Sequence, residues 1–590
     1  MALSSYPDPQ SHSVFRRKWA GFVAAIWLMV FSGNYAFSNY SQALKEVLSL
    51  NQKSLNWLSI ARDIGDAWGG ILAGILSNHL PAWALLCISA TLGITGYGVQ
   101  WLVVSRTIEP LPYWIVATAA MIAGTCIAWI NSAVFNATVR NFTRNSGPVT
   151  GLFKACMGLS GAVFATLCNI LFSSSASMYL IMMVTFPNFF CILSAIFFRP
   201  VPTAATVKEE QFERKSLVKF NIIASALAVY IVFLDFAPSE WKESFGYRAV
   251  AVSILASLIG SPALVPIMLY TRTIKAEYLK EGNDVGALIE NEEEEVNVEV
   301  RDSKDELLSE SMEDMDKHNA LKRPLLDESD KEKGLKDSNV PCDSWRCWGS
   351  SPLTLMPKWA VEGLGEDTPT LSLFRKWHYC VLYISLFFGC GAGVSFSNNL
   401  GQIGQALGFS SANLFVSCFS LGNFFGRLAS GIVSEYFVRV AAVPRTAWMG
   451  VAKVPMIGVF LWLATGSGAA LYVGSMVLGF SNGALITLTI PIVSEFYGLK
   501  HFGTNFVLTV TYLVSGSYVF SSVAGVLYDR QLVSSSSSAE VISLTCYGSA
   551  CYGSTFLILA LCLTVGLAFD ATLTLVSRSL YQKLRASRTE

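Results

Sequence analysis

Charged residues are scarce in this sequence. Only 14% of its 590 residues are Asp, Glu, Lys or Arg, whereas soluble domains carry about 25%. Hydrophobic residues make up 52% of the chain, and the mean hydropathy is +0.46. These values exclude an ordinary set of soluble domains and indicate a polytopic membrane protein.

Motifs of pumps, metal centres and enzymes are also missing. No G-x-x-x-x-G-K-[ST] loop occurs, which disfavours a nucleotide-driven pump. The 13 cysteines are scattered singly, without the spacing of a zinc site or a secreted disulfide framework, and we expect them to act as small hydrophobic side chains. The apolar runs contain no His cluster, HExxH motif or catalytic dyad. We therefore expect no enzymatic activity, no cofactor, no bound metal and no nucleic acid partner.

Fourteen apolar runs are long enough to cross a lipid bilayer, which takes about 20 residues of helix. They form groups of six, two and six. The runs are 19–40, 55–77, 82–104, 113–138, 149–172 and 178–198, then 217–236 and 249–270, then 376–400, 412–437, 443–465, 469–495, 502–528 and 552–575.

Basic residues in the short loops predict the orientation. If the N-terminus is cytoplasmic, seventeen bases flank the inner ends of the runs and six lie in the outer loops. Both termini are therefore expected in the cytoplasm. The predicted organisation is a tail (1–18), a six-helix half (19–198), a linker with two helices (199–270), an acidic loop (271–375), a second six-helix half (376–577) and a tail (578–590).

The formal net charge of zero conceals an acidic insert. Residues 281–340 hold 20 acids and 8 bases, whereas the other 530 residues hold 22 acids and 34 bases. High charge and few aromatic residues favour disorder. We expect this loop on the cytoplasmic side, where it would bind sorting or regulatory proteins, in a chain placed in the tonoplast or the plasma membrane.

An internal repeat relates the two halves. Residues 65–77 and 422–434 align at a constant offset of 357, so that three glycines and a serine coincide. In the same alignment Asp66 meets Asn423 and Gly70 meets Arg427, and just upstream Asn39 and Gln42 match Asn399 and Gln402 after a small shift. Parallel halves of this kind are how major facilitator transporters are built.

The repeat and two helix sequences resemble a known family. The runs RRKWAGFVAAIWLMVFSGNYAFSNYSQALKEVLSL and SLNWLSIARDIGDAWGGILAGILS, with the long hydrophilic loop, are similar to the plant nodulin-like branch of the major facilitator superfamily. The resemblance implies an all-α polytopic membrane protein with a major facilitator fold, two six-helix halves and two extra helices. The superfamily loop motif G-x-L-a-D-r-x-G-r-r is altered, because residues 74–81 read GILSNHLP.

A more distant similarity concerns monocarboxylate porters. Their Asp-x-x-x-Arg pattern, followed by Gly four residues later, stands here as Asn423, Arg427 and Gly431. The arginine is kept and its acid is lost. A lysine of those porters is replaced by Asn39. Anion recognition by Arg427 is therefore expected to survive, whereas the proton-coupling scheme of those porters is not.

Charges and amides inside the spans are the candidate functional residues, since a mid-helix charge costs about 2.5 to 3.5 kcal/mol. For gating or coupling we consider Arg62, Asp63 and Asp66, with Arg62 and Asp66 neutralising each other at a four-residue spacing; the alternative is a lock between helices. Candidates for solute binding are Arg427, Asn423, Lys154, Asn39, Gln42, Asn399 and Gln402. For Arg427 the alternative is a structural ion pair, and for the amides it is contact between helices.

Four further features carry simpler expectations. Asp235 and Asp570 are expected to reach water near helix ends, and Lys453 to extend toward the inner face. The glycine spacings Gly65/Gly69, Gly70/Gly74 and Gly422/Gly426 favour close helix packing and are also what the sliding contact between two rocking halves needs.

Together these features predict a secondary active transporter that works by alternating access. We expect it to carry a small organic solute, an organic anion or monocarboxylate-like compound. A coupling proton is one candidate co-substrate. The alternative is a transporter-like receptor or scaffold without flux, which the altered loop motif favours.

Overall fold

The computed structural model is helical in nearly all of the chain that it describes. The described residues are 9–271 and 363–589, except 33–36, 78, 143–144, 174, 200–206, 239, 242–243, 269, 410–412, 499 and 537–545. The predicted acidic insert lies outside these residues. The helices below belong to one compact unit, Met1–Pro266 with Ser351–Glu590.

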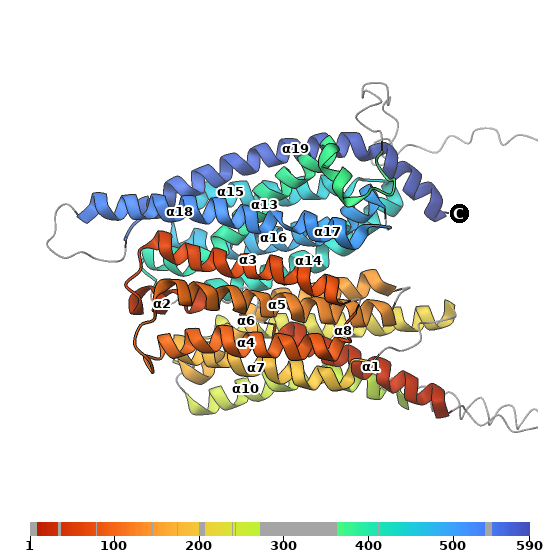
Figure 1. Cartoon of the computed structure of the whole chain (residues 1–590), viewed down its shortest axis with the longest axis horizontal. Helices are drawn as coiled ribbons and strands as arrows, with labels where there is room; N and C mark the ends of the chain where they lie inside the picture. The colour runs from red at the N-terminus through yellow and green to blue at the C-terminus, as the bar shows by residue number, and fades with distance from the viewer. Residues whose placement is uncertain are drawn as a thin grey trace, which may run out of the picture. The chain divides into compact units, whose positions relative to one another are not determined.

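The N-terminal half contains six long helices. A short 3-10 helix, η1 (Phe37–Asn39), and α2 (Ser41–Val47) connect the first two of them. The six are α1 (Pro9–Val30), α3 (Gln52–Leu76), α4 (Ala82–Val104), α5 (Tyr113–Asn141), α6 (Ser146–Phe172) and α7 (Ala176–Phe197), all labelled in Figure 1.

The C-terminal half repeats this order after a 3-10 turn, η7 (Thr370–Arg375). Its fifth helix is divided at Thr511, whose hydroxyl bonds back to the Leu508 carbonyl at 2.6 Å, a contact that bends helices. The helices are α13 (Trp377–Ala406), α14 (Asn413–Ala441), α15 (Arg445–Leu463), α16 (Gly468–Tyr497), α17 (Phe502–Val510) with α18 (Tyr512–Ser536), and α19 (Ala550–Thr589).

Twelve of the described helices are long and apolar enough to cross a membrane. Two other helices of spanning length, α1 and α3, are not among them. Three bases lie together at 16–18 in α1, and α3 holds Arg62, Asp63 and Asp66 in its interior. The predicted fold class is confirmed, whereas the number of fourteen spans stays a prediction.

The internal repeat is also a repeat of helix packing. A Cβ on Gly65 of α3 would lie 1.9 Å from the Met121 carbonyl oxygen of α5, and one on Gly422 of α14 would lie 2.0 Å from the Met476 carbonyl oxygen of α16. In each half the second and fourth helices thus touch backbone to backbone. Because these glycine seams lie inside the halves, the expectation that they form the sliding contact between halves is wrong.

The halves meet along two helix pairs. α3 packs against α18, and α6 packs against α14, which joins elements far apart in the sequence. Each pair combines one helix from either half. A solute site between the halves would therefore be lined by α3, α6, α14 and their neighbour α13.

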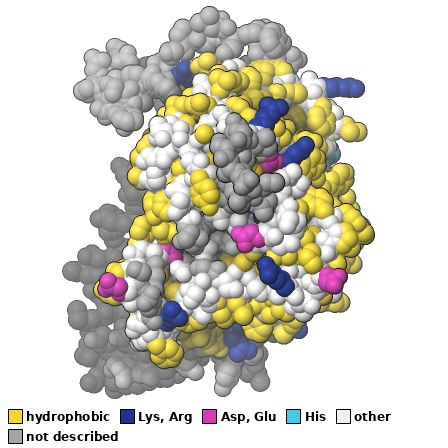
Figure 2. Space-filling model, turned by 90° about the vertical axis from the view of Figure 1, so that its left-hand side faces the viewer, with side chains coloured by type: hydrophobic (Ala, Val, Ile, Leu, Met, Phe, Trp, Pro, Cys, Tyr) yellow, Lys and Arg dark blue, Asp and Glu magenta, His cyan; other side chains and the backbone are white. Residues whose placement is uncertain are grey.

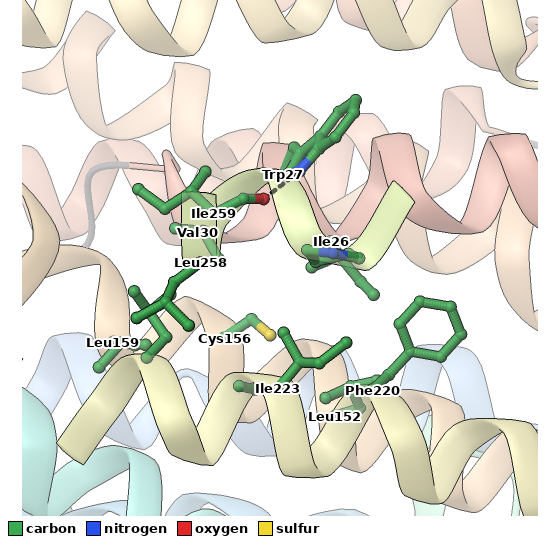
Figure 3. A pocket seen from close by; sticks show the side chains of 13 residues that line it. Ile26, Trp27, Val30, Leu152, Cys156, Leu159, Phe220, Ile223, Leu258 and Ile259 are labelled. Atoms are coloured by element: carbon green, nitrogen blue, oxygen red, sulfur yellow. Dashed lines mark hydrogen bonds between the residues drawn. The ribbon is translucent and has the colours of Figure 1, made fainter. Parts of the chain in front are cut away.

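Two additional helices, α8 (Val207–Asp235) and α10 (Phe245–Gly260) with its 3-10 extension η3 (Ser261–Ala263), join the N-terminal half. α8 lies against α6, and the indole N–H of Trp27 in α1 donates to the Ile259 carbonyl at 2.7 Å (Figure 3). An apolar crevice remains where α1, α6, α8 and α10 converge. Asp235 is buried and accepts a hydrogen bond from Thr166 at 3.0 Å, so the expectation that it reaches water is wrong.

The two ends of the bundle differ chemically. Cys546, which precedes α19, and Cys551, in the first turn of α19, form a disulfide with Cα atoms 6.0 Å apart, which corrects the expectation that the cysteines act only as small hydrophobic side chains. The backbone N–H of Gly548 in this loop donates to the Ala406 carbonyl at 2.8 Å. We call this the disulfide end; the start of α1 and the end of α19 lie at the opposite, terminal end (Figure 1).

Figure 2 views the disulfide end. On the part drawn in colour, apolar and uncharged side chains predominate, and Lys, Arg, Asp and Glu are isolated.

Candidate functional site

At the disulfide end a carboxylate of one half caps a helix of the other. Asp529 of α18 accepts hydrogen bonds from the backbone N–H groups of Gln52 and Lys53, both at 3.0 Å, in the first turn of α3. A negative charge at a helix N-terminus is favourable because the unpaired N–H groups carry partial positive charge. This contact fastens the halves together.

Side-chain amides extend the same contact. Gln52 donates to the Asn399 side chain at 3.1 Å, Asn56 donates to the Ser521 carbonyl at 2.7 Å, and Gln402 donates to the Ser41 hydroxyl at 3.0 Å. We call this set, with Asp529, the disulfide-end latch. Asn399 and Gln402, predicted to bind solute, therefore lie in a closed contact between the halves.

Lys45 on α2 lies beside the latch. Its ammonium donates to the Gln52 side chain at 3.1 Å and lies 4.9 Å from the centre of the Tyr528 ring. Burial lowers the pKa of Lys45 to about 8, although the carboxylates of Asp529 and Glu46 act in the opposite direction. A cation beside the latch can therefore lose its proton under mildly alkaline conditions.

A polar network lies deeper along α3. The Arg62 guanidinium pairs with Asp63 at 2.9 Å and donates to the Asn398 side chain at 3.3 Å. Asp63 accepts from Asn398 at 3.2 Å and from the Ser517 hydroxyl at 2.5 Å, and both of these residues belong to the other half. Arg62 therefore pairs with Asp63 and not with Asp66, contrary to the prediction. The side chains of Arg62 and Asp63 both contact Asn398 on α13, which brings them together.

Asp66 stands apart from this network. Its side chain is exposed, and it makes no hydrogen bond or ion pair with another described residue. Asp66 follows Arg62 by one helical turn, so the two share a helix face that is directed at the other half. Asp66 lies about 21 Å along α3 from Gln52.

Arg427 links the halves at the same region. It is 1% exposed and donates from Nε to the Asn423 side chain at 2.6 Å and from Nη1 to the Lys154 carbonyl of α6 at 2.8 Å. The prediction of a lone guanidinium in a cavity wall thus needs correction, since Arg427 also holds α14 against α6.

Lys154 presents its ammonium beside an aromatic ring. The nitrogen lies 4.8 Å from the centre of the Phe135 ring, a cation–π contact. Lys154 interacts electrostatically with both Asp66 and Arg427. Three charges from α3, α6 and α14 therefore gather between the halves.

Burial along α14 indicates which way this region opens. From Phe415 to Phe424 all residues are buried, whereas on the terminal side of Arg427, residues Leu428 to Val433 are partly or fully exposed. Together with the closed latch, this gradient describes a seam that is shut at the disulfide end and more accessible from the terminal end.

Two predicted solute ligands, Asn39 and Gln42, lie in the segments that connect α1 to α3. Asn39 belongs to η1, which packs against α13 of the other half. Gln42 on α2 donates to Glu46 of the same helix at 2.8 Å. The repeated Asn and Gln pair of the sequence is thus distributed among connecting segments and the latch.

Sequence reasoning missed several buried polar residues. Asn482 of α16 is fully buried, and neither side-chain polar atom has a partner among the described residues. Lys453 and Asp570 form a buried ion pair at 2.6 Å, joined by Ser385. The expectations that Lys453 extends toward the inner face and that Asp570 reaches water are therefore wrong. The two residues lie on different helices, α15 and α19, so no spacing in the sequence indicated that they would pair.

Comparison with known proteins identifies relatives over most of the chain. A family model described as Nodulin-like matches residues 18–267, and a second, described as NFD4, C-terminal domain, matches residues 363–582. The chain is 27% identical to Protein NUCLEAR FUSION DEFECTIVE 4 of Arabidopsis thaliana over 97% of its own length and 91% of that protein.

Two more similarities are weaker. The chain is 28% identical to Probable transporter MCH1 of Yarrowia lipolytica over 36% of its own length and 44% of that protein. A solved structure of the nucleoside transporter NupG is 10% identical, covers 95% of this chain and 99% of its own, and gives a TM-score of 0.49.

Proposed function

Because this chain belongs to the nodulin-like branch of the major facilitator superfamily, we propose that it carries a small organic anion across a membrane by alternating access. The solute would bind between the two six-helix halves. The observation that supports this most is the pairing of Arg427 with the Lys154 carbonyl, which brings two cationic side chains of opposite halves to one depth.

The charges at this depth favour an anion. Arg62 and Asp63 neutralise each other, whereas Arg427 and Lys154 bring two cationic side chains to this region from α14 and α6. Desolvated cations in a membrane are costly unless they meet negative charge. A carboxylate would supply that charge, and a proton on Asp66 is the co-substrate we consider.

The described conformation corresponds to one state of the cycle. With the disulfide-end latch closed, solute would enter and leave from the terminal end. The opposite state requires that the contacts of Asp529, Asn399 and Gln402 across the halves break while the terminal side of α6 and α14 closes.

The disulfide supports the predicted orientation. Disulfides persist in oxidising compartments and are rare in the cytosol. The Cys546–Cys551 bond would therefore face the cell exterior or an organelle lumen, with both termini in the cytoplasm, as expected for a multi-pass protein of the tonoplast or plasma membrane.

Uptake into proteoliposomes tests the proposal. The purified protein should take up at least one labelled carboxylate from a panel of monocarboxylates, dicarboxylates and amino acids with saturable kinetics. Arg427→Gln should reduce that flux at least tenfold, because it removes the charge and the fork of donors. Arg439→Gln, an exposed arginine on the same helix, is the matched control and should transport normally.

Two outcomes would contradict the proposal. Normal flux in Arg427→Gln would remove this residue from the site. The absence of saturable flux for every solute, with correctly folded protein, would instead favour a receptor or scaffold.

A further inference from the structure

We propose that the protein binds an anionic phospholipid of the cytoplasmic leaflet, with one acyl chain in the apolar crevice between α1, α6, α8 and α10 and the phosphate at Arg16 and Lys219. The four helices belong to the N-terminal half and to the two additional helices. The inference uses the proposed orientation, in which the terminal end faces the cytoplasm, and does not depend on which solute is carried.

The crevice is lined by hydrocarbon side chains from all four helices. Ile26 and Val30 of α1, Leu159 of α6, Ile223 of α8 and Leu258 of α10 face it (Figure 3). Of the residues in the apolar windows of α8 and α10, only 39% and 22% are buried, so both helices present most of their surface to the bilayer. Because an apolar cavity stays dry and accepts apolar guests, this crevice suits a hydrocarbon chain.

Contacts at the terminal end hold α1 and α8 side by side. The Lys18 ammonium pairs with the Glu213 carboxylate, which also accepts a hydrogen bond from the Asn145 side chain at 2.8 Å. The rings of Trp19 and Phe220 stack with their centres 5.8 Å apart. The basic run at the start of α1 therefore lies beside the basic residues of α8, and the acid among them is already paired.

The helical repeat places one base of each helix above the crevice. Arg16 precedes Trp27 by eleven residues and Lys219 precedes Ile223 by four, and both spacings return close to the same helix face. Along the helix axes, Arg16 is about 16 Å from Trp27, and Lys219 is about 12 Å from Leu227. One leaflet contributes about 15 Å of hydrocarbon. A lipid with its phosphate at the two bases would therefore reach the crevice with its acyl chain.

The charge at the mouth of the crevice is positive. Arg16 is exposed and Lys219 is half-buried, and neither forms an ion pair with another described residue. Segments 16–18 and 199–219 together hold eight bases and three acids. The cytoplasmic leaflet carries anionic lipids, and basic pockets between spanning helices on that side bind their headgroups. An arginine and a lysine are suited to a phosphate group.

The two features together select an anionic lipid. A soluble phosphate or carboxylate would engage the bases and leave the crevice without an occupant. A zwitterionic lipid would fill the crevice and bring no net charge to the bases. An anionic phospholipid complements the apolar lining and the positive charge at once.

Lipid binding to the purified full-length chain tests the inference. The protein in neutral detergent is titrated with phosphatidylserine, with phosphatidylcholine of the same acyl chains, and with glycerophosphoserine, which has the headgroup and no chain. Native mass spectrometry counts the molecules retained. We expect phosphatidylserine to bind at least tenfold more tightly than either of the other two.

Charge variants test the mouth of the crevice. Arg16→Gln combined with Lys219→Gln should weaken phosphatidylserine binding at least tenfold and leave phosphatidylcholine binding unchanged. Lys500→Gln combined with Lys583→Gln removes two exposed bases from the C-terminal half. This pair is the matched control and should bind phosphatidylserine as the wild type does.

Variants of α8 test the crevice itself. Ala224 lines the crevice, whereas Ala226 is exposed on the same helix. Ala224→Phe should weaken phosphatidylserine binding at least tenfold, because the ring takes the place of the acyl chain, and Ala226→Phe should bind normally. Melting temperatures without lipid check folding. If Ala224→Phe fails to fold, the variants of Arg16 and Lys219, which are not buried, still decide the question.

Four results would overturn the inference. Equal binding of phosphatidylcholine would remove the role of the bases, and equal binding of glycerophosphoserine would indicate a site for soluble phosphates. An equal loss of phosphatidylserine in the Lys500→Gln, Lys583→Gln control would assign binding to overall charge. Normal phosphatidylserine binding in the Arg16→Gln, Lys219→Gln variant would place the lipid elsewhere. None of these results bears on solute uptake, so the proposed function is tested separately.

Discussion

Single residues in this protein differ in how their charge is compensated inside the membrane. Lys453 and Asp570 face each other at 2.6 Å and are almost inaccessible. Arg427 is also buried and donates to the Asn423 side chain and to the Lys154 carbonyl. The Lys453–Asp570 pair therefore stabilises the C-terminal half, whereas Arg427 holds α14 against α6.

The Lys453–Asp570 pair gives a stability prediction. Lys453→Met should destabilise the protein by about 3 to 5 kcal/mol, because it leaves the Asp570 charge buried without a partner. The double variant Lys453→Met, Asp570→Leu should recover most of this loss, since it removes both charges. Thermal unfolding in detergent measures the effect, and equal melting temperatures for wild type and Lys453→Met would contradict it.

Lys45 gives a pH prediction. Burial lowers its pKa to about 8 in the folded state, below the value of 10.5 when exposed, so the unfolded chain binds more protons between these values. Stability should therefore rise with pH above about 8, by about 1 kcal/mol over the first unit. Melting temperatures from pH 7 to 10 measure this rise. Lys45→Met should flatten it, and an unchanged slope in that variant would assign the rise to other groups.

Helices in this fold are held together by close backbone contact as much as by side chains. Gly65 on α3 and Gly422 on α14 occupy equivalent places in the two halves, each against a carbonyl oxygen of the fourth helix. The arrangement fixes α3 and α14 within their own halves. Each helix can then carry its charged residues to the seam without shifting relative to its neighbours.

The glycine seam predicts a contrast on one helix. Gly65→Ala should destabilise the protein by about 1 to 3 kcal/mol, because its Cβ would overlap the Met121 carbonyl. Gly74→Ala, also on α3, has open space around the new Cβ and should be neutral or slightly stabilising, since Ala favours a helix over Gly by about 1 kcal/mol. Similar melting temperatures for the two variants would contradict the close backbone contact of Gly65 with α5.

At the scale of the whole molecule, the latch decides which end of the seam is accessible. Asp529→Asn removes the charge that caps α3, a contribution of about 0.5 to 2 kcal/mol. The variant should populate conformations in which the disulfide end is open. Spin labels on Glu46→Cys and Arg530→Cys, with the free cysteines replaced, should show longer distances in Asp529→Asn than in the parent. An unchanged distance distribution would mean that the latch does not limit opening.

Much of this architecture is predictable from the sequence, because bilayer spans and glycine repeats are encoded locally. The run 82–104 coincides with α4, and the offset of 357 reappears in the packing of Gly65 and Gly422. Partners across helices are not encoded locally. Arg62 pairs with Asp63, and both side chains contact Asn398, which is 336 residues from Arg62. Lys453 likewise pairs with Asp570, which is 117 residues away in the sequence.

The loop closed by Cys546 and Cys551 has a consequence for motion. The disulfide joins Cys546 to the first turn of α19, and the Cys546 N–H donates to the Tyr528 hydroxyl of α18 at 2.8 Å. The Gly548 N–H in the same loop donates to the Ala406 carbonyl of α13. Three helices of the C-terminal half are thus braced at one end. These contacts would keep the three helices together at this end when the two halves move relative to each other.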